Sequence, residues 1–128
     1  MAYKNWAAIA CFGIASATIL GAFGAHALKA KLDPTQLESY KTGVLYLMLN
    51  SIAILALGKL IYRVPGVLIW VGTLLFSLSI VILSTRTIWL DNTTAFSWLG
   101  PVTPLGGSLI IAGWIWTGIK ISQSSVEN

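Results

Sequence analysis

Charged residues divide the sequence into long uncharged runs. The stretches without Asp, Glu, Lys or Arg are residues 5–28 (24 residues), 42–58 (17), 64–85 (22) and 92–119 (28). A helix that crosses a bilayer needs about 20 mostly apolar residues. Its backbone polar groups must also be satisfied within the segment, because hydrocarbon offers them no partner. The pattern therefore predicts transmembrane helices at about 5–28, 34–58, 65–85 and 103–121.

Turn-forming residues set the expected helix ends. Asp33, Pro34 and Gln36 form the pattern of an N-cap, a first-turn proline and a capping-box glutamine. The second helix is therefore expected to start before its apolar run, which leaves only residues 29–32 to join it to the first. Gly58 is expected to end this helix.

The later connections follow the same rules. Pro65 opens the third helix after a short turn, and Thr103 with Pro104 predicts the start of the fourth. The longest connection contains the turn formers Asp91–Thr94. Short connections place sequential helices side by side in opposite directions. The expected fold is a single all-α membrane domain over residues 1–128, a four-helix antiparallel bundle.

Composition supports a lipid environment. The chain is 56% hydrophobic and 9% charged, whereas a soluble domain carries about 25% charged residues. The net charge of +4 comes from scattered residues, so the basic stripe of a nucleic-acid-binding protein is missing. The expected partners are the lipid bilayer and other membrane-protein subunits, with no nucleic acid.

The basic residues give the expected orientation. Lys4, Lys59, Arg63 and Lys120 share one membrane side, and an equal number lies on the other: Lys29, Lys31, Lys41 and Arg86. The tight turn between Lys59 and Arg63 favours the first side as cytoplasmic. We expect both termini in the cytoplasm, in a bacterial inner membrane.

Small residues mark expected helix contacts. Helices in lipid associate through close packing and hydrogen bonds, and small side chains let their backbones approach. The first expected helix has small residues at every fourth position, and the fourth has a glycine pair. They are Gly13, Ala17, Gly21, Ala25, Gly106 and Gly107. The partner of this stripe is either another helix of the same chain or another subunit.

Three polar residues are the candidates for a ligand site. His26 is the single histidine and lies near a membrane end, where it acts as an interfacial anchor or as a proton or quinone ligand. Asn50 lies near the middle of the second helix, where an amide needs a partner. With Thr103 at a helix start, these residues define a hypothetical polar pocket. With one histidine and one cysteine, we expect no metal site, no cofactor and no catalytic residues.

Several segments together resemble a known family. The most specific are Gly21-Ala-Phe-Gly-Ala-His26 and Thr103-Pro-Leu-Gly-Gly107; others include Thr42-Gly43, Ala53–Gly58, Leu75–Ser79 and Ala112–Trp114. The chain resembles the YgdD-like small bacterial membrane proteins, a family of unknown function with relatives in mitochondria-bearing organisms. The resemblance implies a four-helix inner-membrane protein and no particular reaction. Such proteins usually carry a second histidine where this chain has Asn50, which weakens a histidine-pair cofactor site.

Three functional hypotheses follow. The first is a non-enzymatic accessory or assembly subunit of a larger membrane complex, since packing faces are abundant and ionisable groups within the spans are scarce. The second is a quinone- or small-molecule-binding protein that uses His26 and Asn50. The third, an oligomeric transporter, has less support because the spans lack internal charge.

Overall fold

The structure is a computed structural model that describes residues 2–90 and 94–124. Its long helices are α1 (Tyr3–Phe23), α2 (Pro34–Leu57), α3 (Arg63–Trp89) and α4 (Val102–Gln123), with short helical turns η1 (Gly24–Leu28), η2 (Gly58–Leu60) and η3 (Ser97–Leu99). Four helical segments of 26 or 27 residues are long and apolar enough to cross a membrane. The prediction of an all-helical bundle is confirmed, and its four long helices are candidate membrane spans.

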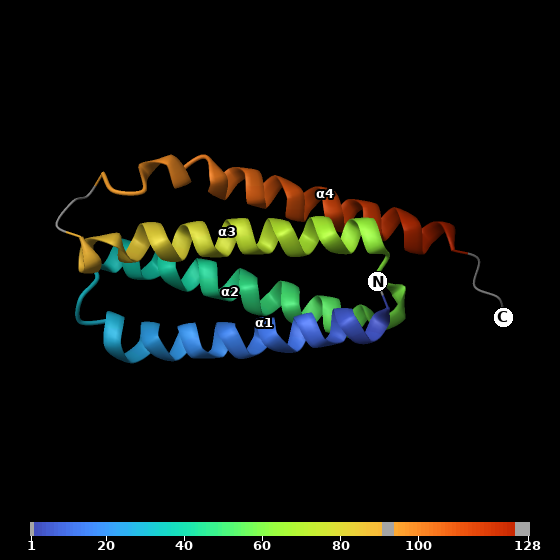
Figure 1. The fold of residues 1–128 in the computed structure, drawn as a ribbon, viewed down its shortest axis with the longest axis horizontal. Coiled ribbons are helices and arrows are strands. Elements are labelled where there is room, and N and C mark those ends of the chain that lie inside the picture. Colours follow the sequence, from blue (N-terminus) through green and yellow to red (C-terminus); the bar gives the residue numbers. More distant parts are fainter. Residues whose placement is uncertain (1, 91–93, 125–128) are drawn as a thin grey trace.

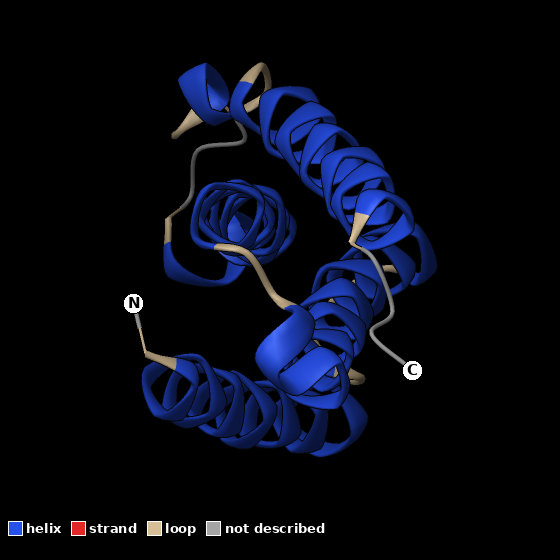
Figure 2. Ribbon diagram, turned by 90° about the vertical axis from the view of Figure 1, so that its right-hand side faces the viewer, coloured by secondary structure: helices blue, strands red, loops and turns tan. Residues whose placement is uncertain are grey.

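Successive helices run in opposite directions along the long axis, and they follow in the order α1, α2, α3 and α4 from the bottom to the top of the view (Figure 1). Contacts join α1 to α2, α2 to α3 and, most extensively, α3 to α4. Seen along the bundle, the helices with the N-terminus and the C-terminus lie on opposite sides (Figure 2). The helix α1 therefore has one main neighbour within the chain.

The ends of α2 form as the sequence predicts. The Asp33 carboxylate accepts a hydrogen bond from the Gln36 backbone N–H at 2.9 Å, and the Gln36 side-chain oxygen accepts from the Asp33 N–H at 3.2 Å. This capping box satisfies two donors that the first turn leaves without helical partners. At the other end Gly58 takes a φ of 57°, which glycine adopts without the steric penalty of a side chain.

Two predicted boundaries differ from the structure. α3 continues to Trp89, past the expected end near residue 85. Arg86 lies in the last turn, and its long side chain carries the charge away from this turn, where the guanidinium Nη1 donates to the Ala95 carbonyl at 3.1 Å. α4 begins at Val102 after Pro101, with no side-chain cap, so Thr103 is not the N-cap. Of the expected turn Asp91–Thr94, residues 91–93 lie outside the described residues.

Glycines bring α3 and α4 into backbone contact. A Cβ added to Gly106 would lie 2.5 Å from the Phe76 nitrogen and 2.8 Å from the Gly72 oxygen. A Cβ on Gly113 would lie 2.6 Å from Ile69 Cγ1. These distances leave no space for a side chain, so the two helices pack at the close range that membrane interfaces use.

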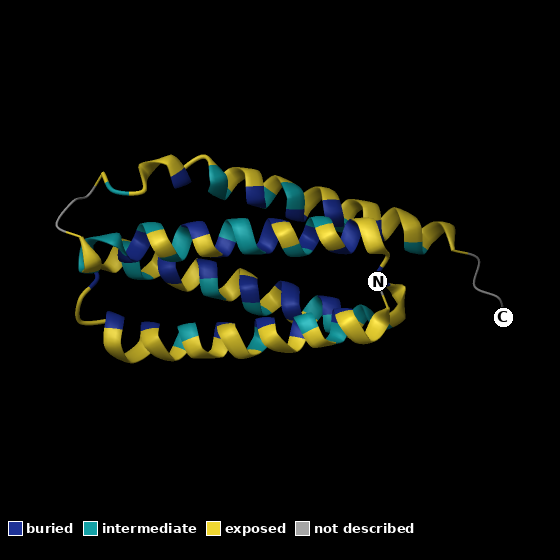
Figure 3. Cartoon of the chain, in the orientation of Figure 1, coloured by how far each residue is buried: buried dark blue, intermediate teal, exposed yellow. Residues whose placement is uncertain are grey.

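The described residues form two apolar core clusters: Leu28, Leu32 and Tyr40 make up one near the turn between α1 and α2, and the other lies toward the end that holds the N-terminus. Trp6 and Ala10 of α1 pack there with Ile54 of α2 and Ile69 of α3. The burial pattern leaves most of α1 exposed, with buried positions along one side of the helix only (Figure 3). This exposed side is available to lipid or to another protein.

Candidate functional site

The segment with the single histidine forms a widened turn. α1 changes at Gly24 from an α-helix to the π-helix Gly24–Leu28. Beside this change the Tyr40 hydroxyl of α2 donates to the Leu20 carbonyl at 2.6 Å. The Tyr40 ring lies so near Gly24 that a Cβ there would be 2.7 Å from ring atom Cε1. The Leu20 carbonyl also accepts from the Gly24 N–H within the helix, so the Tyr40 hydroxyl shares this acceptor at the point where the π-turn begins.

His26 is exposed on this turn. Together with Ile19, Ala22, Phe23 and Ala27, all from the same helical segment, it lines a shallow cavity of about 360 Å³. Its neighbours there are apolar, and none comes from α2 or α4. The imidazole therefore faces the surroundings of the bundle.

Asn50 connects two helices. Its side chain is 6% exposed, and its Oδ1 accepts a hydrogen bond from Trp114 Nε1 of α4 at 2.8 Å. Its Nδ2 donates to the Tyr46 carbonyl at 3.0 Å. Both ends of the amide thus have a partner, which is what a polar group at this depth requires.

Thr103 makes a different interhelical contact. Its hydroxyl lies 2.6 Å from the Ser79 hydroxyl of α3, and Ser79 also donates to the Phe76 carbonyl at 3.0 Å. Ser79 is 2% exposed. The pair is a packing contact between α3 and α4.

The structure does not bring His26, Asn50 and Thr103 into one pocket. His26 faces outward, and the other two are engaged with Trp114 and Ser79. Among the described residues, no three His, Cys, Asp or Glu side chains are grouped so that they could hold a metal ion.

The predicted packing residues occupy two settings. Gly13 and Ala17 are buried, Gly21 is half-buried, and Ala25 is exposed. The stripe thus begins inside the bundle and opens toward the π-turn into a groove of about 410 Å³, whose far wall includes Val44 of α2. In α4, Gly106 is buried against α3 and Gly107 is half-buried.

A second row of small residues lies at exposed positions of α1 and η1. It shares Ala25 with the first row, and Thr18 and Ala25 also border the groove toward α2. We call it the α1 seam: Ala8, Cys11, Ala15, Thr18, Ala22 and Ala25, all exposed. Its members follow one another at alternating steps of three and four residues, the spacing of a helix–helix seam. Large side chains border it, including Phe12 at 74% and Phe23 at 56% exposed. This spacing is visible in the sequence, but for this helix the packing prediction named only the stripe of small residues at every fourth position.

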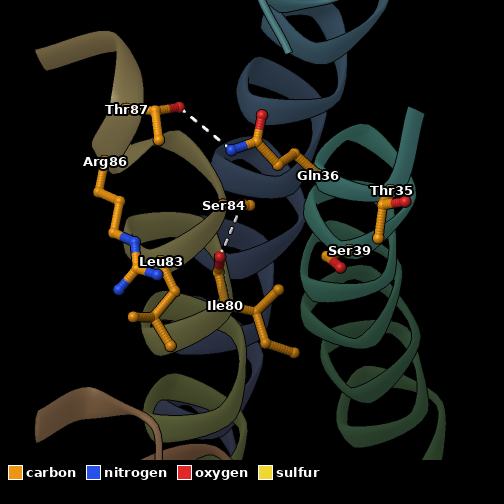
Figure 4. Close-up of a pocket in the computed structure, with 8 residues that line it drawn as sticks. All are labelled: Thr35, Gln36, Ser39, Ile80, Leu83, Ser84, Arg86 and Thr87. Atoms are coloured by element: carbon orange, nitrogen blue, oxygen red, sulfur yellow. Dashed lines mark hydrogen bonds between the residues drawn. The ribbon is translucent and has the colours of Figure 1, made fainter. Parts of the chain in front are cut away.

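A polar pocket of about 320 Å³ lies where the start of α2 meets the end of α3 (Figure 4). Its lining comes from residues that sequence reasoning did not connect: Thr35, Gln36, Ser39, Ile80, Leu83, Ser84, Arg86 and Thr87. Gln36 Nε2 donates to Thr87 Oγ1 at 3.1 Å and bridges the two helices. The capping box predicted the start of α2, which forms one wall of this pocket. No pattern in the sequence indicated that the end of α3 forms the other wall.

Comparisons with known proteins find relatives that are described as membrane proteins. Residues 20–107 match the family described as "Protein of unknown function (DUF423)". The UPF0382 membrane protein YwdK of Bacillus subtilis is 36% identical over 104 residues, which are 75% of this chain and 78% of that protein. A UPF0382 membrane protein of Schizosaccharomyces pombe is 34% identical over 113 residues, covering 85% of this chain and 93% of its own length.

No solved structure matches the chain significantly. The family match covers more than half of the sequence, and the relatives align over most of their own length. The protein is a multi-pass membrane protein, and it belongs to the DUF423/UPF0382 family of membrane proteins of unknown function.

Proposed function

We propose that the protein is a non-enzymatic accessory or assembly subunit of a larger inner-membrane complex, with both termini in the cytoplasm. The observation that carries the proposal is the α1 seam. Hydrocarbon makes no demand for small side chains, whereas a partner helix does, because small residues let two backbones approach. Exposed small residues from Ala8 to Ala25 form a continuous contact strip of this kind.

The surroundings of the α1 seam support its role as a contact for a partner helix. α1 packs mainly on α2, so its other side lacks a partner helix within the described chain. Thr18 satisfies its own hydroxyl by donating to the Ile14 carbonyl at 2.8 Å. The seam can therefore meet an apolar helix without burying an unpaired donor.

The polar groups inside the bundle also fit a structural role. Apart from the phenol of Tyr40 and the indole of Trp6, the buried polar side chains of the described residues are neutral amides and hydroxyls: Asn50, Ser51, Thr73, Ser77, Ser79, Ser84, Thr85 and Thr117. Proton relays and ion paths use ionisable groups within the spans. The outward-facing His26 and the engaged Asn50 supply no common ligand site, so we do not extend the quinone hypothesis.

Substitution on the seam should separate the chain from its partner. In the double variant Ala15→Leu/Ala22→Leu, the added side chains keep a partner backbone at a distance, and the complex is expected to be lost. The control Ala56→Leu/Ala112→Leu makes the same chemical change at exposed sites on α2 and α4. The measurement is the native mass of the affinity-purified protein in mild detergent.

We expect the unmodified protein and the control to carry a second protein at a fixed ratio, and the seam variant to run alone while still folded. A lone chain in every sample, or a partner retained equally by both double variants, contradicts the proposal.

A further inference from the structure

The polar pocket between α2 and α3 combines one positive charge with several hydroxyl groups. Arg86 supplies the charge, and Thr35, Ser39 and Thr87 supply hydroxyls from both helices. None of the described residues that line it is acidic. Arginine offers five N–H donors, and the described contact with the Ala95 carbonyl involves Nη1. Among the described residues the other guanidinium donors have no hydrogen-bond partner, so they are open to an anion.

The start of α2 contributes side chains to this pocket. Thr35, Gln36 and Ser39 lie in the first two turns of α2, which begins at Pro34. The Asp33 carboxylate already accepts from the Gln36 N–H at this helix start and offsets the partial positive charge there, so the attraction for an anion comes from Arg86. Ser84, on the opposite wall, is 5% exposed, and its hydroxyl donates to the Ile80 carbonyl at 2.7 Å. This donor is already used within α3, so Ser84 supplies no hydrogen bond to an anion.

The position of the pocket along the bundle and its change from polar to apolar lining both suit a lipid. It lies at the end of the bundle where α2 begins and α3 finishes (Figure 1), which places it near the headgroups of a bilayer. Ile80 and Leu83 continue its lining along α3 toward the centre of the span. A headgroup among the polar side chains would thus leave its acyl chains beside apolar ones. Basic pockets between transmembrane helices are known to hold anionic lipid headgroups.

We propose that this pocket binds the phosphodiester of an anionic phospholipid, with Arg86 as the charged ligand. The hydroxyls of Thr35, Ser39 and Thr87 complete the donor set, and Ile80 with Leu83 receives the start of an acyl chain. The proposal is independent of the α1 seam, which lies on another helix.

Native mass spectrometry of the purified protein can test it with phosphatidylglycerol and phosphatidylcholine of equal chain length. We expect one phosphatidylglycerol per chain, bound at least about tenfold more tightly than phosphatidylcholine, since charge-assisted hydrogen bonds are worth that much. Arg86→Gln should remove this preference, while Arg63→Gln, at the opposite end of the bundle, should retain it. A preference for phosphatidylglycerol that survives Arg86→Gln overturns the proposal. The role of Arg86 would then be limited to its hydrogen bond to the Ala95 carbonyl.

A second variant covers the case in which Arg86→Gln fails to fold. Ser39→Leu fills the pocket from an exposed position on α2 and should lower phosphatidylglycerol binding at least about tenfold. Ser108→Leu, exposed on α4 and outside the pocket lining, should leave it unchanged. Excess inorganic phosphate should not displace the lipid, because it lacks acyl chains; displacement would assign the site to free phosphate instead.

Discussion

Gly106→Ala is expected to unfold at a clearly lower temperature than the unmodified protein. The new Cβ would lie 2.5 Å from the Phe76 nitrogen and 2.8 Å from the Gly72 oxygen. Both are backbone atoms, so no side chain can rotate away and α4 must move off α3. Overpacking a tight interior costs about 1–3 kcal/mol and sometimes more. Thermal unfolding in detergent, followed by circular dichroism, measures the loss.

Gly118→Ala is the matched control in the same helix. A Cβ on Gly118 meets no described atom within 4 Å, and alanine favours a helix over glycine by about 1 kcal/mol. This variant should be as stable as the unmodified protein or slightly more stable. Equal unfolding temperatures for the two alanine variants would mean that α3 and α4 do not pack through Gly106.

Asn50→Leu is expected to be the second large effect. It removes the acceptor for Trp114 Nε1, which lies 2.8 Å from Asn50 Oδ1, and leaves an indole donor unpaired inside the bundle. A buried donor without a partner costs about 1–3 kcal/mol. Unfolding of Asn50→Leu, Trp114→Phe and the double variant gives the coupling energy, which we expect at about 0.6–2 kcal/mol.

Asn50→His serves as the conservative comparison. A neutral imidazole has one acceptor and one donor, so it can replace both roles of the amide and should lose little stability. Strictly additive effects in the Asn50 and Trp114 variants would show that the hydrogen bond does not link α2 to α4.

The spans and one capped end were predictable because they depend on local chemistry. Uncharged runs of sufficient length specify helices in lipid, and Asp33 with Gln36 specifies a cap from residues three apart. The predicted end of α3, near residue 85, is too early, because the prediction uses Arg86 as the limit of the span. A long side chain can carry its charge beyond its own helical turn, so the helix continues past Arg86. The prediction of Thr103 as the N-cap of α4 was wrong, because its hydroxyl contacts Ser79 and does not cap the helix.

The candidate site was less predictable because it depends on which helix faces meet. Helices that are apolar all round give little indication of their inward side, so the outward position of His26 and the bond from Asn50 to Trp114 could not be read from the sequence. Gly72 allows close helix packing only because it lies opposite Gly106 of α4, and the sequence does not show this pairing. The polar pocket requires the start of α2 beside the end of α3, which is a consequence of the whole bundle.

The central claim is that the α1 seam contacts a different membrane protein. Phe12 borders the seam and is 74% exposed, so a photoreactive p-benzoylphenylalanine at this position changes the helix little. Illumination of intact membranes should give one discrete adduct of this chain with one other protein. The same probe at Trp116, 41% exposed on α4, should not give it. An identical pattern from both positions, or an adduct of two copies of this chain alone, would contradict the claim.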